Sequence, residues 1–462
     1  MKAQPTTKPE DQESGAFFED LEEHLKPTCV KMCTGISCLL NGARRERENL
    51  KRVGHDCEAV SCLGHCDRSP VFMDELTLQL ADLPTQIRCH APLPVVTKRI
   101  LTTNAAKLDV ALENGVYASI PVAFSHTPED LIDLVTASGI RGRGGAGIPT
   151  GEKWKVTASK PSGKKYVIAN GNESEPGSFI DRVLFEEDPH TIIEGMILCG
   201  YAIGADEGII HIRSEYPFAA GIMNRAILDA RKAGYLGTNI FGSGINFDIR
   251  IFVGVGSYRY VKEPEFIQSI DGGDRPDGSP DPGLYGKPTV INNVETFANI
   301  PFIVTNGEGV FQAMGTNASS GTKVTCLNAG FANPGIAEIE YGTTLREIIE
   351  EIGGGGRNGK EIVAVFIGGP MGSIVLPKDW DLPLCFDVLK RNSIRMGHGG
   401  FVAIPGNVNL RALLDYLNEF AVHESCRELI QGPVDTLNRE FGHRLTETTS
   451  GGQRRSPKGA ST

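Results

Sequence analysis

The chain has 462 residues, of which 40% are hydrophobic, so two to four domains with buried cores are expected. Its formal net charge of −11 at pH 7 argues against nucleic acid and anionic membrane as partners. No segment approaches the roughly 18–20 apolar residues of a membrane span, and residues 1–14 lack the apolar core of an export signal. We therefore expect a cytoplasmic protein without direct membrane insertion.

Residues 1–27 are polar and acidic, and four cysteines follow in two closely spaced pairs. The pairs are C-x4-C at Cys33 and Cys38 and C-x3-C at Cys62 and Cys66. In a chain without an export signal, the eleven cysteines favour metal ligation over disulfides. Soft thiolates select iron–sulfur clusters or zinc, and zinc sites more often use C-x2-C pairs. The spacing therefore predicts an iron–sulfur cluster.

A glycine-rich stretch at residues 138–154 follows a proline-rich linker at 84–99 and an expected helix from Thr127. The stretch contains six glycines, two arginines and a lysine. The bare amides of such a loop can form a concave nest for anions, so we expect it to bind phosphate. A flexible linker is the alternative, but a linker would more often contain serine than arginine, isoleucine and tryptophan.

Three further polar or glycine-rich blocks occupy residues 169–179, 254–258 and 286–296. The first two follow strand-like apolar runs, and helices are expected between the strands. This βαβα alternation predicts a Rossmann-like parallel sheet. Because α/β folds place ligand sites at the ends of their strands, the blocks are candidates for a binding site.

Beyond residue 320 the pattern changes. A strand is expected over Thr322–Leu327, a capped helix from Thr343 and another helix over Asn409–Phe420. Residues 447–462 are rich in glycine, serine and arginine and are expected to be disordered.

The four blocks, in this order, resemble the NADH-binding flavoprotein subunit of respiratory complex I and the diaphorase subunits of soluble hydrogenases and NAD-dependent formate dehydrogenases. The cysteine region resembles the thioredoxin-like [2Fe–2S] ferredoxin subunit of complex I, trimmed and fused to the flavoprotein. The resemblance implies an α/β fold built from these parts: a polar tail at 1–27, a thioredoxin-like [2Fe–2S] domain at 28–83, a linker at 84–99, a Rossmann-like FMN domain at 100–320, a β-grasp (ubiquitin-like) segment at 321–405, C-terminal helices at 406–446 and a tail at 447–462.

The resemblance also implies two cofactors, FMN and one [2Fe–2S] cluster. The cluster ligands would be Cys33, Cys38, Cys62 and Cys66. Glu175 matches a family residue near NADH and is the candidate catalytic residue. Cofactor contacts would come from Gly142, Arg143, Gly144, Lys153, Asn170, Asn172, Glu173, Tyr258, Glu263, Asn292 and Asn293.

Two departures from the family pattern weaken the prediction of an NAD(H) site. Ile148 replaces an aromatic that helps to cover the nicotinamide nucleotide, and residues 275–283 lack the Lys and Phe that help to hold adenine. Base stacking is worth ~1–3 kcal/mol, so NAD(H) is expected to bind weakly and to be a doubtful donor. Val261, Lys262 and Pro264 further replace Gly, Glu and Thr beside the flavin site.

A further departure concerns the C-x2-C-x2-C motif that holds a [4Fe–4S] cluster in the family. The motif should begin near Glu424, but no cysteine follows Cys426. This chain alone is therefore not expected to form that cluster.

The favoured interpretation is an electron-transfer subunit of a diaphorase-type oxidoreductase complex, in which FMN and one [2Fe–2S] cluster exchange electrons. Its expected partners are iron–sulfur, dehydrogenase or hydrogenase subunits. The alternatives are a flavin electron carrier that docks to a partner without using NAD(H), and a non-catalytic scaffold. The four retained flavin blocks beside four cluster cysteines favour the first.

Overall fold

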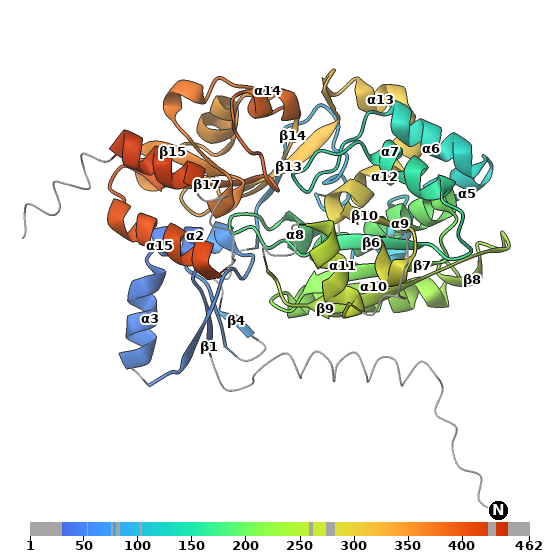
Figure 1. Ribbon diagram of the computed structural model, residues 1–462, viewed down its shortest axis with the longest axis horizontal. Helices are drawn as coiled ribbons and strands as arrows, with labels where there is room; N and C mark the ends of the chain where they lie inside the picture. Colours follow the sequence, from blue (N-terminus) through green and yellow to red (C-terminus); the bar gives the residue numbers. More distant parts are fainter. Residues whose placement is uncertain are drawn as a thin grey trace, which may run out of the picture.

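The computed structural model describes residues 30–52, 54–74, 77–79, 84–101, 104–257, 262–273, 282–423 and 431–441. Some predicted features lie outside these residues: the tails at 1–27 and 447–462, Tyr258, Val261 and Cys426. The α/β fold class is confirmed, since helices pack around three larger sheets (Figure 1). No helix in this part of the chain is both long and apolar enough to cross a membrane.

The cysteine region folds as a small four-stranded sheet in the order β2-β1-β3-β4. Its first two strands are parallel, and two helices connect them. The elements are β1 (Val30–Cys33), α2 (Ile36–Leu40), α3 (Ala43–Arg52), β2 (Cys57–Val60), β3 (Phe72–Asp74) and β4 (Thr77–Gln79). Both Cys33, at the end of β1, and Cys62, just after β2, come at the same edge of this sheet because parallel strands end on the same side.

The central part is a five-stranded sheet in the order β10-β6-β7-β9-β8, with four parallel strands and β8 antiparallel at one edge. The strands are β6 (Tyr166–Gly171), β7 (Glu207–Arg213), β8 (Gly237–Ile240), β9 (Ile245–Gly254) and β10 (Thr289–Asn293). The helices are α4 (Leu108–Glu113), α5 (Ser119–Phe124), α6 (Pro128–Ala137), α7 (Thr150–Ser159), α8 (Ile180–Glu187), α9 (Pro189–Ile203), α10 (Pro217–Lys232), α11 (Glu263–Asp271), α12 (Val294–Asn306) and α13 (Glu308–Gln312).

The helix expected from Thr127 is confirmed as α6. The Thr127 hydroxyl accepts from the Asp130 amide, and the Asp130 carboxylate accepts from the Thr127 amide. This reciprocal capping box gives two amides at the start of the helix a hydrogen-bond partner. β7 and α9 are buried almost throughout because the sheet is covered on both faces.

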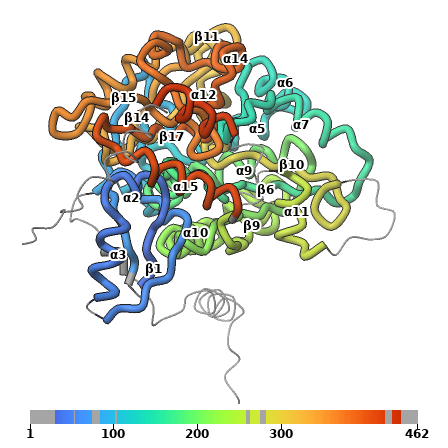
Figure 2. The backbone as a smooth tube through the Cα atoms, turned by 60° about the vertical axis from the view of Figure 1, so that its left-hand side comes forward, coloured from blue at the N-terminus to red at the C-terminus, as the bar shows by residue number. Residues whose placement is uncertain are grey.

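The third sheet has the order β16-β15-β17-β13-β14-β5. Its strands are β13 (Thr322–Leu327), β14 (Gly335–Glu340), β15 (Ile362–Ile367), β16 (Ser373–Val375), β17 (Gly400–Pro405) and β5 (Ile87–Cys89), and the π-helix η4 (Glu347–Ile352) and α14 (Phe386–Arg391) accompany them. α15 (Leu410–His423) and a helix at 431–441 follow. Figure 2 shows α15 passing beside α2, where the C-terminal helices meet the cysteine region.

The stretch at 84–99, expected as a linker, contributes the edge strand β5, which pairs in parallel with β14. The buried carboxylate of Glu338 fixes residues 95–97, which follow β5 in the sequence. Glu338 accepts hydrogen bonds from the amides of Val95, Val96 and Thr97 at 2.8–3.0 Å and from the hydroxyls of Thr97 and Thr322 at 2.6 Å. The linker prediction missed this role because its anchor lies far away in the sequence.

Replacing Glu338 by Ala should lower the free energy of unfolding by about 3 kcal/mol, because three buried amides lose their acceptor. Thermal unfolding of Glu338→Ala measures this loss. The control is Glu361→Ala, which removes an exposed carboxylate and should leave the melting temperature nearly unchanged.

Candidate functional site

The glycine loop is closed at its base by a bridge between Arg141 and Pro149, and the Gly142 amide donates to the Ile148 carbonyl at 2.8 Å. α7 begins directly after it. Within the described residues, the amides of Gly144, Gly145 and Ala146 donate to no protein acceptor. Free amides at the tip of a closed loop can form a concavity for an anion, so the geometry is compatible with the phosphate site that the sequence predicts.

Gly145 shows why the tip requires glycine. Its φ is +107°, and a Cβ there would lie 2.7 Å from the Gly397 carbonyl oxygen. The loop therefore packs its backbone directly against the segment after α14, and a side chain at this position would force the two apart.

The side chains of the two arginines in the loop donate hydrogen bonds to backbone carbonyls and so hold the loop in place. Arg141 donates to the carbonyls of Gly147 and Ala318 at 2.7 and 2.9 Å. The Arg143 guanidinium is fully buried, donates to the carbonyls of Arg141 and Ser320, and lies over the Tyr341 ring at 4.9 Å. The amide of Arg143 donates to the Thr296 hydroxyl. The side chain of Arg143, a residue predicted as a cofactor contact, thus bonds to groups inside the protein.

A large cavity of about 770 Å³ opens between the glycine loop, the end of β6 and the segment after α14. A smaller one of about 140 Å³ adjoins it, since Gly144, Ala146, Asn170 and Asn293 line both. The combined space has the size of a cofactor or ligand site. Predicted site residues with a place in its lining are Gly142, Gly144, Lys153, Asn170, Asn172, Glu173, Glu175, Glu263, Asn292 and Asn293.

The smaller cavity carries the site's lysine. Lys153 forms an ion pair with Glu263 and donates to the Ile291 carbonyl at 2.7 Å. Asn292, with its amide assigned from its surroundings, accepts from the Trp154 indole at 3.0 Å and donates to the Ile291 carbonyl at 3.0 Å. One cation beside the free loop amides gives this end of the site the charge and the donors that an anion needs.

The larger cavity carries amide and carboxylate groups with unused hydrogen-bonding capacity. Asn170 Oδ1 accepts from the Asn172 amide, and Asn172 Nδ2 donates to the Ser257 carbonyl at 2.9 Å. Within the described residues, Asn172 Oδ1 and Glu175 Oε1 are buried without a hydrogen-bond partner. Buried polar atoms without partners are costly, so their presence in a cavity wall fits a polar ligand.

Glu173 is a buried carboxylate with four donors from the protein. It accepts from the Ser178 hydroxyl, the Asp181 and Arg182 amides and the Tyr216 hydroxyl at 3.0–3.1 Å. Burial, reinforced by the negative charge of Asp181, raises the pKa of Glu173 to about 7. Glu173 is therefore fixed in the cavity wall.

Sequence reasoning missed Asp181 and His398, which complete this wall. His398 Nε2 lies 3.4 Å from Asp181 Oδ1, and Asn293 Nδ2 donates to both Asp181 oxygens at 2.9–3.0 Å. Burial disfavours the imidazolium, but Asp181 and Glu173 outweigh burial and raise the pKa of His398 to about 9. The two residues come from α8 and from the segment before β17, so only the fold brings them together.

The four motif cysteines gather in one buried cluster, each with 2% exposure or less. Cys62 Sγ lies 3.7 Å from Cys66 Sγ and accepts from the Gly64 amide at 3.3 Å. Hydrogen bonds from Cys33 and Cys66 lower the pKa of Cys62 well below its ordinary value. Four adjacent sulfurs, one of them with a lowered thiol pKa, fit an iron–sulfur cluster.

Arg213, at the end of β7, joins the cysteine cluster to the cavity. Its fully buried guanidinium donates to the Cys62 carbonyl at 2.7 Å and to the Glu173 carbonyl at 2.6 Å. Beside it, Tyr216 packs so closely on Gly64 that a Cβ there would lie 2.4 Å from the ring. The two predicted sites are therefore one hydrogen-bonded unit.

Comparison with known proteins agrees with this geometry. Residues 135–302 match the Nuo51 FMN-binding domain of the Complex1_51K family model. The NADP-reducing hydrogenase subunit HndC of Solidesulfovibrio fructosivorans is 41% identical over 71% of this chain and 69% of its own length. An NADH-quinone oxidoreductase subunit of Rhizobium meliloti is 37% identical over 75% of this chain and 85% of its own.

The chain belongs to this family of FMN-binding oxidoreductase subunits. An NAD+-reducing [NiFe]-hydrogenase in the H2-reduced state has the same fold, with a TM-score of 0.71 and 24% identity over 90% of this chain and 77% of that one. The resemblance drawn from the four blocks is confirmed. The doubt about NAD(H) is at odds with the family, whose members named above are an NADH-quinone oxidoreductase subunit and an NADP-reducing hydrogenase subunit.

The His398–Asp181 pair makes a prediction about pH. The folded-state pKa of about 9 exceeds the ordinary value of 6.5, so protonation of His398 stabilises the fold below about pH 6.5, and this contribution is lost as pH rises through 9. Its size is about 3 kcal/mol. The carboxylates facing the imidazole are Asp181 and Glu173, and Lys323 opposes them.

Thermal unfolding from pH 7 to 9.5 measures this contribution. The wild-type melting temperature should fall over this range, and His398→Gln should flatten the fall. The exposed His126→Gln is the control and should keep the wild-type slope. Equal slopes for all three proteins would contradict the assignment.

Proposed function

We propose that this protein is an electron-transfer subunit that binds FMN in the joined cavities, holds one [2Fe–2S] cluster on Cys33, Cys38, Cys62 and Cys66, and exchanges electrons with NAD(P)H. The observation that carries the proposal is the Arg213 bridge, which ties the Cys62 carbonyl to the Glu173 carbonyl of the cavity wall. A non-catalytic scaffold would not need a cysteine cluster joined to a large polar cavity through a buried arginine.

The smaller cavity is proposed for the phosphate of FMN. The free amides of Gly144, Gly145 and Ala146 and the Lys153 ammonium supply hydrogen bonds and positive charge there. Glu263 neutralises Lys153 until a phosphate replaces it as the partner. Arg143 takes part only as the buried support of the loop.

The larger cavity is proposed for the flavin ring. Asn170, Asn172 and Asn293 offer amide donors and acceptors to the polar edge of the ring, and Tyr258 is retained as a proposed contact. When bound, FMN supplies the conversion between two-electron and one-electron transfer, which no side chain provides. The residues of this chain bind and orient it, and the His398–Asp181 pair holds a proton beside it.

NAD(P)H is proposed as the two-electron partner. The relatives carry NADH and NADP in their names, and the larger cavity has a volume of about 770 Å³. Glu175 accepts from the His398 amide at 2.9 Å and keeps one buried oxygen unpaired in this cavity, so it is the proposed contact to the nucleotide. Ile148, which is half exposed, cannot stack as an aromatic would, so we expect modest affinity.

The partners are proposed to be subunits of a redox complex, since the relatives named above are subunits themselves. No cysteine follows Cys426, so this chain is proposed to supply no [4Fe–4S] cluster. A cytoplasmic location is part of the same proposal.

Anaerobic titration of the purified protein with NADH and with NADPH tests the proposal directly. We expect about one FMN per chain, bleaching of flavin absorbance and a [2Fe–2S] EPR signal after reduction. Cys62→Ser should abolish the signal and lower bound iron, while Cys89→Ser, outside the cluster, should keep both. A preparation without flavin, or flavin that neither nucleotide bleaches, would overturn the corresponding part.

Lys153→Ala should raise the dissociation constant for FMN about tenfold to a hundredfold, because one charge-assisted hydrogen bond to phosphate is lost. Fluorescence titration of the apoprotein with FMN measures it. Lys155→Ala is the matched control, since Lys155 lies exposed on the same helix outside both cavities. Riboflavin, which lacks phosphate, should bind both variants alike.

A further inference from the structure

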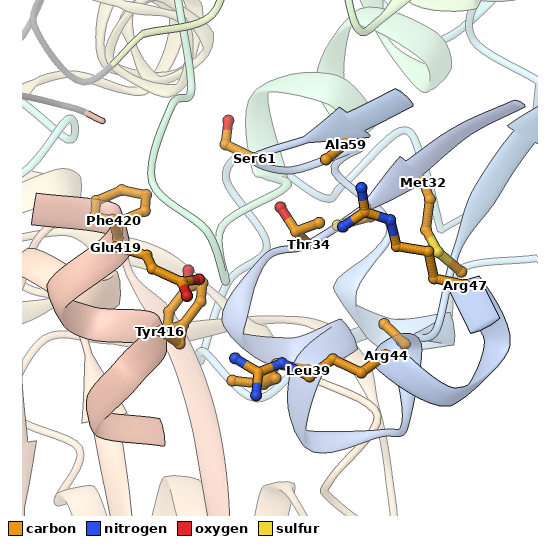
Figure 3. A pocket seen from close by; sticks show the side chains of 12 residues that line it. Met32, Thr34, Leu39, Arg44, Arg47, Ala59, Ser61, Tyr416, Glu419 and Phe420 are labelled. Atoms are coloured by element: carbon orange, nitrogen blue, oxygen red, sulfur yellow. The ribbon is translucent and has the colours of Figure 1, made fainter. Parts of the chain in front are cut away.

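A separate cavity of about 400 Å³ lies between α3 and α15 and reaches the cysteine cluster. We call it the α3–α15 groove, and its lining shares no residue with the two cavities of the flavin site. Figure 3 shows Tyr416, Glu419 and Phe420 of α15 facing the residues of the cysteine region across it. Its lining includes Cys33, Arg44, Arg47, Tyr416, Glu419 and Phe420.

The groove reaches the cysteine cluster because Cys33 belongs to both. Cys33 lines the groove and is one of the four gathered thiols, whereas Arg213 contacts the cluster loop at Cys62 and leads to the flavin cavity. The cluster is therefore approached by two distinct routes, one internal and one from the protein surface.

The groove combines an apolar lining with unpaired positive charge. α3 carries five basic and two acidic residues in a chain with a net charge of −11. Within the described residues, Arg44 and Arg47 form no ion pair, although Glu419 lines the same groove. Arg47 Nε is also buried without a hydrogen-bond acceptor. An apolar pocket with Arg44 and Arg47 at its edge, one exposed and one with a buried, unpartnered Nε, complements an acidic protein surface.

We propose that the α3–α15 groove is the docking site for an acidic one-electron carrier protein of the ferredoxin class. The proposal rests on the cluster assigned above. It deepens that assignment, because it places the exchange of electrons with a partner at Cys33.

The proposed transfer of one electron neither forms nor breaks a covalent bond. Cys33, Cys38, Cys62 and Cys66 would hold the cluster, which would supply one-electron transfer, so that a cluster of the partner would be reduced as this one is oxidised. No proton or leaving group moves, and the two-electron donor of the flavin site supplies the electrons.

Calorimetric titration of the full-length holoprotein with an acidic [2Fe–2S] ferredoxin tests the site. The double variant Arg44→Glu/Arg47→Glu should weaken binding about tenfold at low salt, and the difference should shrink at high salt as the charges are screened. Arg225→Glu is the control, since Arg225 is an exposed arginine on α10 outside the groove, and it should bind like wild type.

Each other outcome overturns the proposal. If the wild-type protein does not bind the ferredoxin, a ferredoxin is not the partner. If wild type and Arg44→Glu/Arg47→Glu bind it equally, the ferredoxin does not dock at the groove. Self-association that only the double variant abolishes would reassign the groove to a second copy of the chain. Flavin bleaching by NAD(P)H in the double variant separates these results from failure of the flavin assignment, because both arginines lie outside the flavin site.

Discussion

The buried guanidinium of Arg213 is the interaction on which the arrangement of the molecule depends. It donates to the carbonyls of Cys62 and Glu173, which lie just after strands of two different sheets, β2 and β6. A buried cation must have partners, so this residue holds the two segments at hydrogen-bonding distance. Glu215, at 3.2 Å, balances its charge. The cysteine cluster is therefore connected to the wall of the cavity through hydrogen bonds.

The cavity wall contains buried negative charges that also need hydrogen-bond partners. Glu173 and Asp181 are buried carboxylates, and backbone amides, Asn293 and His398 satisfy them. Fixed dipoles and charges of this kind are organised before a ligand arrives, so binding does not require them to reorient. A rigid, charged wall beside a loop of free amides suits a cofactor that carries both a phosphate and a polar ring.

The third sheet contributes to the site through loops. The segment between α14 and β17 supplies His398 and presses Gly397 against Gly145 of the glycine loop. The strand β5, anchored by Glu338, ties the same sheet to the start of the flavin domain. α15 then closes against α2 and forms the groove at Cys33. Three sheets thus converge on one redox unit.

The sequence by itself determined the family, the alternation of strands and helices, the strand Thr322–Leu327 and the capped helix at Thr127, because these depend on local spacing and on motifs. It also named the four cysteines that the structure brings together. Only the tertiary structure decided that Arg143 supports the loop from inside, that residues 84–99 add a strand, and that His398 pairs with Asp181. These depend on contacts between distant segments, which no local pattern records.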